Sequence, residues 1–336
     1  MGIVHKKKYD NIMVHVERLC DRPIIGPETH SSIGDNIQGP SLIRVPDWIK
    51  DPLGRYYLYF ADHKGTYIRL AYSNALSGPW QVHPPGSLHL KDSLFPTEPP
   101  PVPADGGAAA MDSSRASMPG KRSHDFTIEA TTTHIASPDI HVNEDEQNIV
   151  MYFHGLEAFA KQATRVAVSE NGIDFVAKPE ILGRTYFRVF QRPDAVYAMA
   201  MPGQFYRSQD GYTGFEEGPR LFNPDMRHSA LLQRGNTMHV FWTQVGHAPE
   251  SILLSSIDLS NDWTTWQETE PIVILRPEHS WEGADKPNEP SIRSTAYGHV
   301  NQLRDPAIFE EDGNVYLLYA VAGESGIGLA QVHLDS

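Results

Sequence analysis

The chain has a single cysteine, no long apolar run and no excess of positive charge. One cysteine, Cys20, excludes an internal disulfide. A membrane-spanning helix needs about 18 consecutive apolar residues, and the sequence contains no such run. The basic N-terminal residues are not followed by the apolar stretch of a secretory signal. These absences predict a cytoplasmic location and no membrane partner.

Several motif classes are missing as well. The sequence has no phosphate-binding P-loop, no Gly-rich dinucleotide fingerprint, no zinc-finger cysteine spacing and no EF-hand loop. Its formal net charge is -14 at pH 7, which disfavours binding to a phosphodiester backbone. We therefore expect no nucleic-acid partner and no required cofactor.

A degenerate repeat is the main positive signal. Five times, a short apolar strand that opens beside polar residues is followed by a strand rich in Tyr and Phe. One small sheet cannot bury its own apolar faces and must stack on neighbours. The repeat predicts an all-β fold, a five-bladed β-propeller in which residues 1–336 form one domain. The openings are residues 39–43, 137–140, 186–190, 227–231 and 304–308.

Three segments do not fit the repeat. Residues 11–19 have strand character but no blade, and the last repeat ends at Leu334 without an outer strand, so we predict that this N-terminal strand completes blade five and closes the ring. Residues 84–130 are rich in Pro, Ser, Ala and Gly and are expected to form a flexible insertion. Residues 276–302 form a second loop insertion, between blades four and five.

The openings of inner strands converge on one central funnel, and the loops between second and third strands reach the same mouth. Ligand sites favour such concave centres. Arginines at three of these places, on an acidic chain, indicate an anionic group on the substrate. The predicted substrate-binding residues are Asp62, His63, His154, Arg188, Arg227, Arg304, Gln244, Trp281 and Glu282.

The segment Arg304-Asp305-Pro306-Ala307-Ile308, followed by Asp312-Gly313 and a Tyr-rich strand, resembles the five-bladed propeller glycoside hydrolases of families 43 and 32. Ser137-Pro138-Asp139-Ile140 supports the resemblance. It implies that Asp305 is the general base and that Asp139 is the second aspartate, which orients substrate and tunes the pKa. It also makes an axial Ca²⁺ an option, with His228 and Asp305 as contributors.

The general acid is left open by the sequence, because no repeat opens with a glutamate. The candidates are the loop residues Glu157, Glu282 and Asp62, together with His228. A carboxyl acid would need a raised pKa, which burial provides.

Three functions fit these residues. The first is a glycoside hydrolase acting on small oligosaccharides or glycosides, including acidic sugars, by general acid/base catalysis in the funnel. The second is a lyase or isomerase on a sugar or other anionic metabolite, with His228 or His154 as the base and Arg188 stabilising an anion. The third is a non-catalytic sugar-binding propeller. In each case the partner is a small carbohydrate or anionic metabolite.

Overall fold

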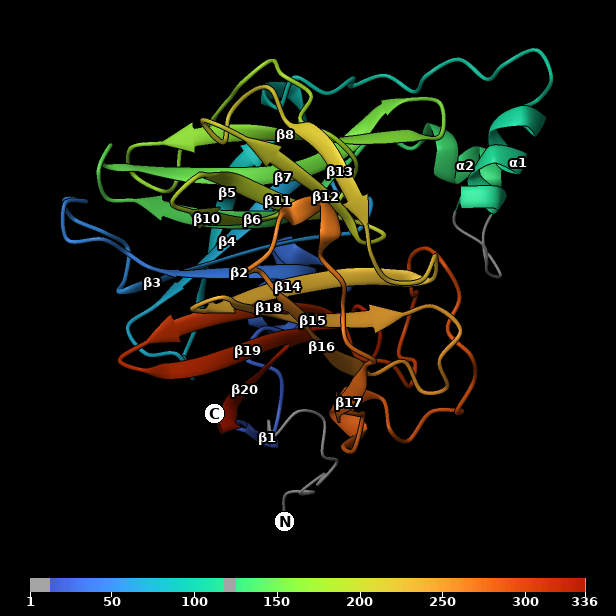
Figure 1. Cartoon of the computed structure of the whole chain (residues 1–336). Helices are drawn as coiled ribbons and strands as arrows, with labels where there is room; N and C mark the ends of the chain where they lie inside the picture. Colours follow the sequence, from blue (N-terminus) through green and yellow to red (C-terminus); the bar gives the residue numbers. More distant parts are fainter. Residues whose placement is uncertain (1–12, 118–124, 336) are drawn as a thin grey trace.

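The computed structural model describes residues 13–117 and 125–335. They form five four-stranded antiparallel sheets arranged around an axis, so the predicted five-bladed propeller is confirmed (Figure 1). The inner strands of the five blades surround the axis, and they contact one another most closely from blade two through blades one and five to blade four.

Each blade runs outward from its inner strand. Blade one contains β2 (Gln38–Arg44), β3 (Tyr56–Ala61), β4 (Tyr67–Ser73) and β5 (Gln81–His89). Blade two contains β6 (Ile135–Asn143), β7 (Asn148–Ala158), β8 (Lys161–Ser169) and β9 (Val176–Ala177). Blade three contains β10 (Arg188–Arg192), β11 (Ala195–Ala200), β12 (Gln204–Ser208) and β13 (Glu216–Arg220). Blade four contains β14 (Met226–Arg234), β15 (Thr237–Gln244), β16 (Ile252–Asp258) and β17 (Ile272–Leu275).

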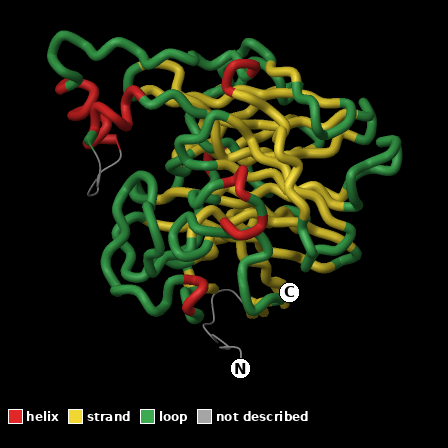
Figure 2. The backbone as a smooth tube through the Cα atoms, turned by 180° about the vertical axis from the view of Figure 1, so that it is seen from behind, coloured by secondary structure: helices red, strands yellow, loops and turns green. Residues whose placement is uncertain are grey.

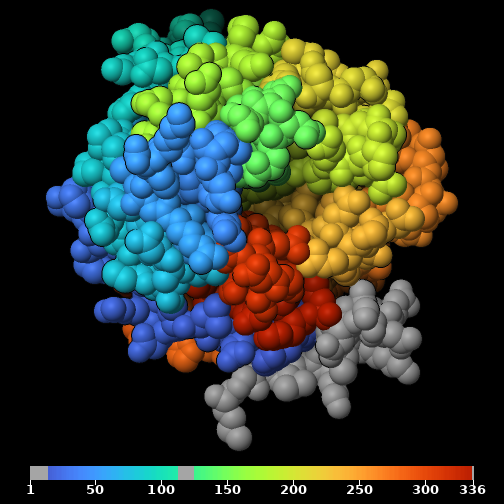
Figure 3. Space-filling model, turned by 90° about the vertical axis from the view of Figure 1, so that its left-hand side faces the viewer, coloured from blue at the N-terminus to red at the C-terminus, as the bar shows by residue number. Residues whose placement is uncertain are grey.

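Blade five is assembled from both ends of the chain. It contains β18 (Arg304–Glu311), β19 (Asn314–Ala320), β20 (Ile327–Asp335) and the N-terminal strand β1 (Met13–Arg18). Strand β1 pairs with β20 in antiparallel register, from Met13 opposite Asp335 to Arg18 opposite Ala330. The predicted closure of the ring is therefore confirmed, although its first two residues, 11 and 12, lie outside the described range. Figure 3 shows the chain colours running around the ring, with C-terminal red beside N-terminal blue.

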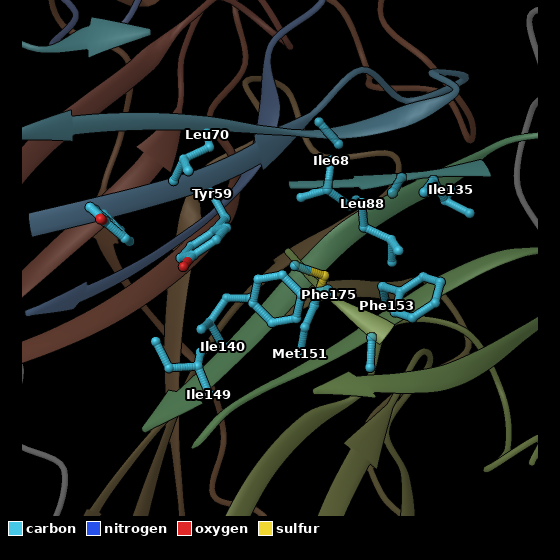
Figure 4. Packing of buried hydrophobic residues seen from close by; sticks show 14 of the residues in the cluster. Tyr59, Ile68, Leu70, Leu88, Ile135, Ile140, Ile149, Met151, Phe153 and Phe175 are labelled. Carbon is cyan, nitrogen blue, oxygen red and sulfur yellow. The ribbon is translucent and has the colours of Figure 1, made fainter. Parts of the chain in front are cut away.

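The core lies between neighbouring blades rather than inside one sheet. Between blades one and two, Tyr59 packs edge-on against Phe175 at a centroid distance of 5.9 Å, and Met151 and Phe153 join the same buried cluster (Figure 4). The Tyr59 hydroxyl also donates to the Gly172 carbonyl at 2.6 Å. This packing explains why the second strands are rich in aromatic residues, since each must fill the wedge between two sheets.

The two insertions lie on the same side of the propeller (Figures 1 and 2). The first begins inside β5 and contains a 3₁₀ turn (Leu90–Asp92) and the helices α1 (Ala108–Ser117) and α2 (Phe126–Thr131). The second runs from the end of β17 to β18 and contains a 3₁₀ turn (Ser280–Glu282). Further 3₁₀ turns occupy Pro27–Thr29, Ser31–Ile33 and Trp263–Thr265. None of the helices described is long and apolar enough to cross a membrane.

Candidate active site

One residue with a positive φ stands at the start of each inner strand, and we call these five the ring positions. They are Gly39 (φ 60°), Ser137 (49°), Tyr186 (69°), His228 (45°) and Asp305 (46°). In four blades the strand pairing also slips at this point. Because a side chain makes a positive φ costly, by about 1–3 kcal/mol per residue, the four non-glycine members mark backbone strain that points to a functional site.

Four ring positions line a central cleft of about 280 Å³, namely Ser137, Tyr186, His228 and Asp305. Both insertions contribute to its lining, the first through α2 and the second through Arg293 and Ser294. Side chains from all five blades therefore meet at one point, as the inner-strand geometry requires.

The carboxyl group of Asp305 is strongly perturbed by its surroundings in the cleft. Its side chain is buried, Oδ1 accepts a hydrogen bond from the Tyr186 hydroxyl at 2.8 Å, and Oδ2 has no hydrogen-bond partner among the described residues. Burial, and then the negative charge of Glu324, raise the pKa of Asp305 to about 6, although Tyr186 opposes the shift. A buried carboxylate oxygen without a donor is costly unless water or a ligand supplies one.

His228 lies beside this carboxyl group, with Nε2 3.8 Å from Oδ1 of Asp305. Its Nδ1 is 3.2 Å from the Thr243 hydroxyl, which itself donates to the Arg227 carbonyl, so Nδ1 carries the proton and Nε2 is an acceptor. Burial, and then the charges of Arg227 and Arg304, hold the pKa of His228 well below its usual value. The neutral ring is thus suited to accept a hydrogen bond from a ligand rather than to donate a proton.

Aromatic rings continue from His228 across the cleft. The Tyr186 ring lies 5.5 Å from the His228 ring and 6.2 Å from the His154 ring. His154 is buried, and its Nδ1 has no hydrogen-bond partner among the described residues. Burial, and then the charges of His63 and Lys64, keep the pKa of His154 well below its usual value. This wall is polar but uncharged.

A buried network of ion pairs holds residues next to the strained ring positions. Glu250 accepts two hydrogen bonds from Arg227, one of them from Nε at 2.9 Å, and lies 3.5 Å from Arg304. Arg304 also donates to Glu324 at 2.7 Å. Glu324 in turn accepts from Asn36 and lies 3.2 Å from His63. The network therefore joins blades four and five to the loops of blade one.

Five of the residues expected from the sequence line the cleft. They are Asp305, His228, His63, His154 and Arg227. The other eight are not in its lining: Asp139, Glu157, Asp62, Arg188, Arg304, Gln244, Trp281 and Glu282.

Asp139 is placed two residues beyond its ring position. Ser137, not Asp139, stands where Asp305 stands in blade five. The Asp139 carboxylate accepts from the Val189 amide and contacts His141 at 2.8 Å, so it joins blade two to blade three. Its geometry is that of a structural link.

Four further residues are held by other partners. Glu157 pairs with Arg165 at 3.0 Å, and Glu282 accepts hydrogen bonds from Arg18, which joins β1 to the second insertion. The Arg188 guanidinium donates to backbone carbonyls such as that of Ser229, at 2.9 Å. Arg304 belongs to the buried network. The guanidiniums of Arg188 and Arg304 do not line the cleft.

The last three lie at other parts of the surface. Asp62 is 3.6 Å from Arg69, Gln244 accepts from Asn223 at 2.8 Å, and Trp281 stacks on His279. Trp281 lines a separate groove beside β1 rather than the central cleft.

Several lining residues are absent from the site residues predicted from the sequence, among them Tyr186, Ser137, Lys64 and Glu129. Ser137 had a usable signal, whereas Tyr186 did not, because it precedes Phe187. In three blades the ring position directly precedes a proline, as in Gly39-Pro40, Ser137-Pro138 and Asp305-Pro306. Glu129 had none, because its helix belongs to the insertion.

The ring does not fit the axial calcium ion considered above. Calcium prefers a cluster of oxygen ligands, whereas His228 offers a ring nitrogen and lies near the charges of Arg227 and Arg304. Within the described ranges, no group of three or more His, Cys, Asp or Glu side chains could hold a metal ion.

Tyr186→Phe tests the link between the tyrosine and the carboxyl group. The phenol donates to the charged form of Asp305, so its removal should raise the pKa of Asp305 further above 6. If Asp305 must be ionised, the acidic limb of the pH profile of kcat/KM should move to higher pH. Tyr152→Phe, whose hydroxyl donates to Gly211 away from the cleft, should leave the limb in place. An unchanged limb in Tyr186→Phe would disprove the link.

No family model matches the chain. A curated relative is the uncharacterized protein R118 of Acanthamoeba polyphaga mimivirus, which is 34% identical over 88% of this chain and 83% of its own length. The chain belongs to the R118 family. The name of this relative states no activity.

Solved structures establish the wider fold class. A family 43 enzyme of Xanthomonas citri superposes with a TM-score of 0.54 at 12% identity, covering 93% of this chain and 90% of that one. A family 43 β-xylosidase/α-arabinofuranosidase from a compost microbial metagenome gives 0.52 at 12% identity, covering 93% and 92%. This member of the R118 family thus has the five-bladed propeller fold of the family 43 and family 32 glycoside hydrolases.

Proposed function

We propose that the chain is a glycoside hydrolase in which Asp305 is the general base. The observation that carries the proposal is the state of Asp305: a buried carboxyl group at a strained ring position, with a pKa raised to about 6 and one oxygen lacking a partner among the described residues. A pKa near the working pH is what general base catalysis requires. The family 43 propellers share the fold that surrounds this carboxyl group.

In the proposed reaction, Oδ2 of Asp305 accepts a proton from a water molecule as that water attacks the anomeric carbon. Tyr186 holds Oδ1, which fixes the direction of Oδ2. The nearby ring nitrogens, Nε2 of His228 and Nδ1 of His154, are positioned to bind hydroxyl groups of the sugar. Tyr186 thus takes the orienting part that the sequence resemblance assigned to Asp139.

The cleft favours a small substrate with a negative charge. Its volume of about 280 Å³ is near the lower end for small-molecule sites. Among the described residues, its lining holds the cations Lys64, Lys161, Arg184, Arg227 and Arg293 but only the carboxylates Asp305 and Glu129. Arg227 and Arg293 are paired with Glu250 and Asp225, and Arg184 lies 3.8 Å from Glu217. This leaves the lysines as the main candidates to bind a uronic-acid carboxylate. Solved relatives in fold were captured with xylose and xylotriose, which are neutral.

Incubation with neutral and uronic-acid-containing oligosaccharides, followed by mass spectrometry, tests the activity. Hydrolysis adds the mass of one water across the two products. Cleavage without that gain, with new ultraviolet absorbance from a carbon-carbon double bond, would show a lyase instead. Binding without any turnover would leave the sugar-binding role.

Lys64→Met tests the charge preference. Lys64 lies in the cleft wall, and burial lowers its pKa although Glu129 and Glu324 oppose the shift. Loss of a charged hydrogen bond costs about 1.5–3 kcal/mol, so KM for a uronic-acid glycoside should rise roughly tenfold to a hundredfold. KM for the neutral counterpart should not change. Lys178→Met, whose ammonium lies over Tyr212 outside the cleft lining, is the matched control. Equal effects on both substrates would contradict the preference.

A further inference from the structure

The short helix α2 presents one face to the cleft. Phe126, Glu129 and Ala130 line it, and their spacing of three and four residues places them on the same side of the helix. Ile128, on another side, is exposed. The helix is begun by Asp125, whose carboxylate accepts from the amide of Thr127 at 2.7 Å.

Blade two holds this helix in place. The hairpin of strands β7 and β8 extends toward α2, and its turn contacts the helix (Figure 1). The Phe126 and Phe159 rings pack edge-on at 6.1 Å, and the Ala160 amide donates to the Ala130 carbonyl at 3.0 Å. The long β7–β8 hairpin therefore fixes the side of α2 that carries Glu129.

Two carboxyl groups line the cleft in the part of the chain that the structure describes, Asp305 and Glu129. The earlier candidates Glu157, Glu282 and Asp62 do not line it, and His228 is neutral with Nε2 as an acceptor. Asp305 belongs to blade five at the ring, whereas Glu129 belongs to the insertion wall. The two groups thus approach a bound sugar from different elements.

We propose that Glu129 is the general acid of the hydrolysis. This inference rests on the proposed function and extends it, because it assigns the acid to the insertion rather than to a blade. As water attacks the anomeric carbon, the bond from that carbon to the leaving oxygen breaks and the Glu129 proton moves to the leaving oxygen. Asp305 receives the proton that the water loses. Proton exchange with solvent then returns both carboxyl groups to their starting states.

Leaving-group dependence tests this role. Once the preferred sugar is known, its methyl glycoside and its 2,4-dinitrophenyl glycoside are compared. Dinitrophenolate is a weak base and leaves without being protonated. Methoxide is a strong base, so the leaving oxygen of the methyl glycoside must be protonated as the bond breaks. Glu129→Gln should therefore lower kcat on the methyl glycoside by about 100-fold to 10,000-fold and change kcat on the dinitrophenyl glycoside little. Glu98→Gln, the same change at an exposed glutamate of the same insertion, should leave both rates unchanged.

The outcomes separate the two proposals. If the wild-type protein hydrolyses both glycosides and Glu129→Gln affects them equally, or affects neither, the acid role is overturned and the proposed function stands. If the wild-type protein hydrolyses neither, both proposals fall. Calorimetric binding of the free sugar to Glu129→Gln shows that the cleft is intact, so that a selective loss on the methyl glycoside reports proton donation.

Discussion

Asp305→Asn is expected to abolish turnover while the protein becomes more stable at neutral pH. The asparagine keeps the size of the side chain and can accept the Tyr186 hydrogen bond, but it cannot take a proton from water. General base catalysis contributes about 100-fold to 10,000-fold, so kcat should fall by at least that range. Steady-state kinetics on the preferred glycoside measures the loss.

The stability gain follows from the direction of the pKa shift. The pKa of Asp305 is near 6 in the folded protein and 3.8 ordinarily, so ionisation at neutral pH opposes folding. Below pH 4 the carboxyl group is protonated in both the folded and the unfolded state, so it does not lower the free energy of unfolding. Above pH 6 it lowers the free energy of unfolding by its full amount. Two pKa units correspond to roughly 3 kcal/mol, which is the upper limit of the gain. Urea unfolding at pH 4 and pH 7.5 should show the gain only at the higher pH.

Asp139→Asn is the informative control for both measurements. Asp139 is the other inner-strand aspartate that resembles a family 43 residue, yet its carboxylate contacts Val189 and His141 outside the cleft. It should retain turnover. If Asp139→Asn lost activity and Asp305→Asn kept it, the assignment of the base would be wrong.

The sequence was sufficient for the fold because a propeller repeats its signals. Every blade has its own turn residues and its own aromatic second strand, and even the missing outer strand of blade five could be matched to residues 11–19. A strand that is assigned wrongly in one blade can be corrected by comparison with the other four. The exact position of a residue within one strand is not repeated in this way, so the other blades do not correct it.

Asp139 shows the consequence for the site. The letters Ser-Pro-Asp and Arg-Asp-Pro are alike, but alignment on the proline places Ser137 with Asp305 and moves Asp139 two residues along the strand. The arginines show a second limit, since a sequence does not say that Glu250 and Glu324 are buried beside Arg227 and Arg304. Glu129 shows a third limit. It lies in an insertion, and an insertion has no repeated pattern from which the position of the residue in the fold could be predicted.

Glu250→Gln is expected to cause the largest loss of stability. Glu250 is fully buried, and the charges of Arg227 and Arg304 overcome the effect of burial and lower its pKa. Removing one charge leaves Arg227 without its carboxylate, since its other hydrogen bond goes to the Ile292 carbonyl. Breaking a buried pair in this way costs about 3–5 kcal/mol. Glu310→Gln, in an exposed pair with Arg234, should cost less than about 1 kcal/mol.

Urea unfolding of the two variants at pH 7 makes the comparison, and equal losses would show that burial of the network is unimportant. The double variant Arg227→Met and Glu250→Met separates charge from packing. If an uncompensated guanidinium causes the loss, removing both charges should recover part of it, because apolar residues often replace a buried pair without cost. Arg227 directly precedes ring position His228, so even a stable double variant should bind sugar poorly. On this view the network is kept because it holds the ring in its strained geometry, and stability alone would not require it.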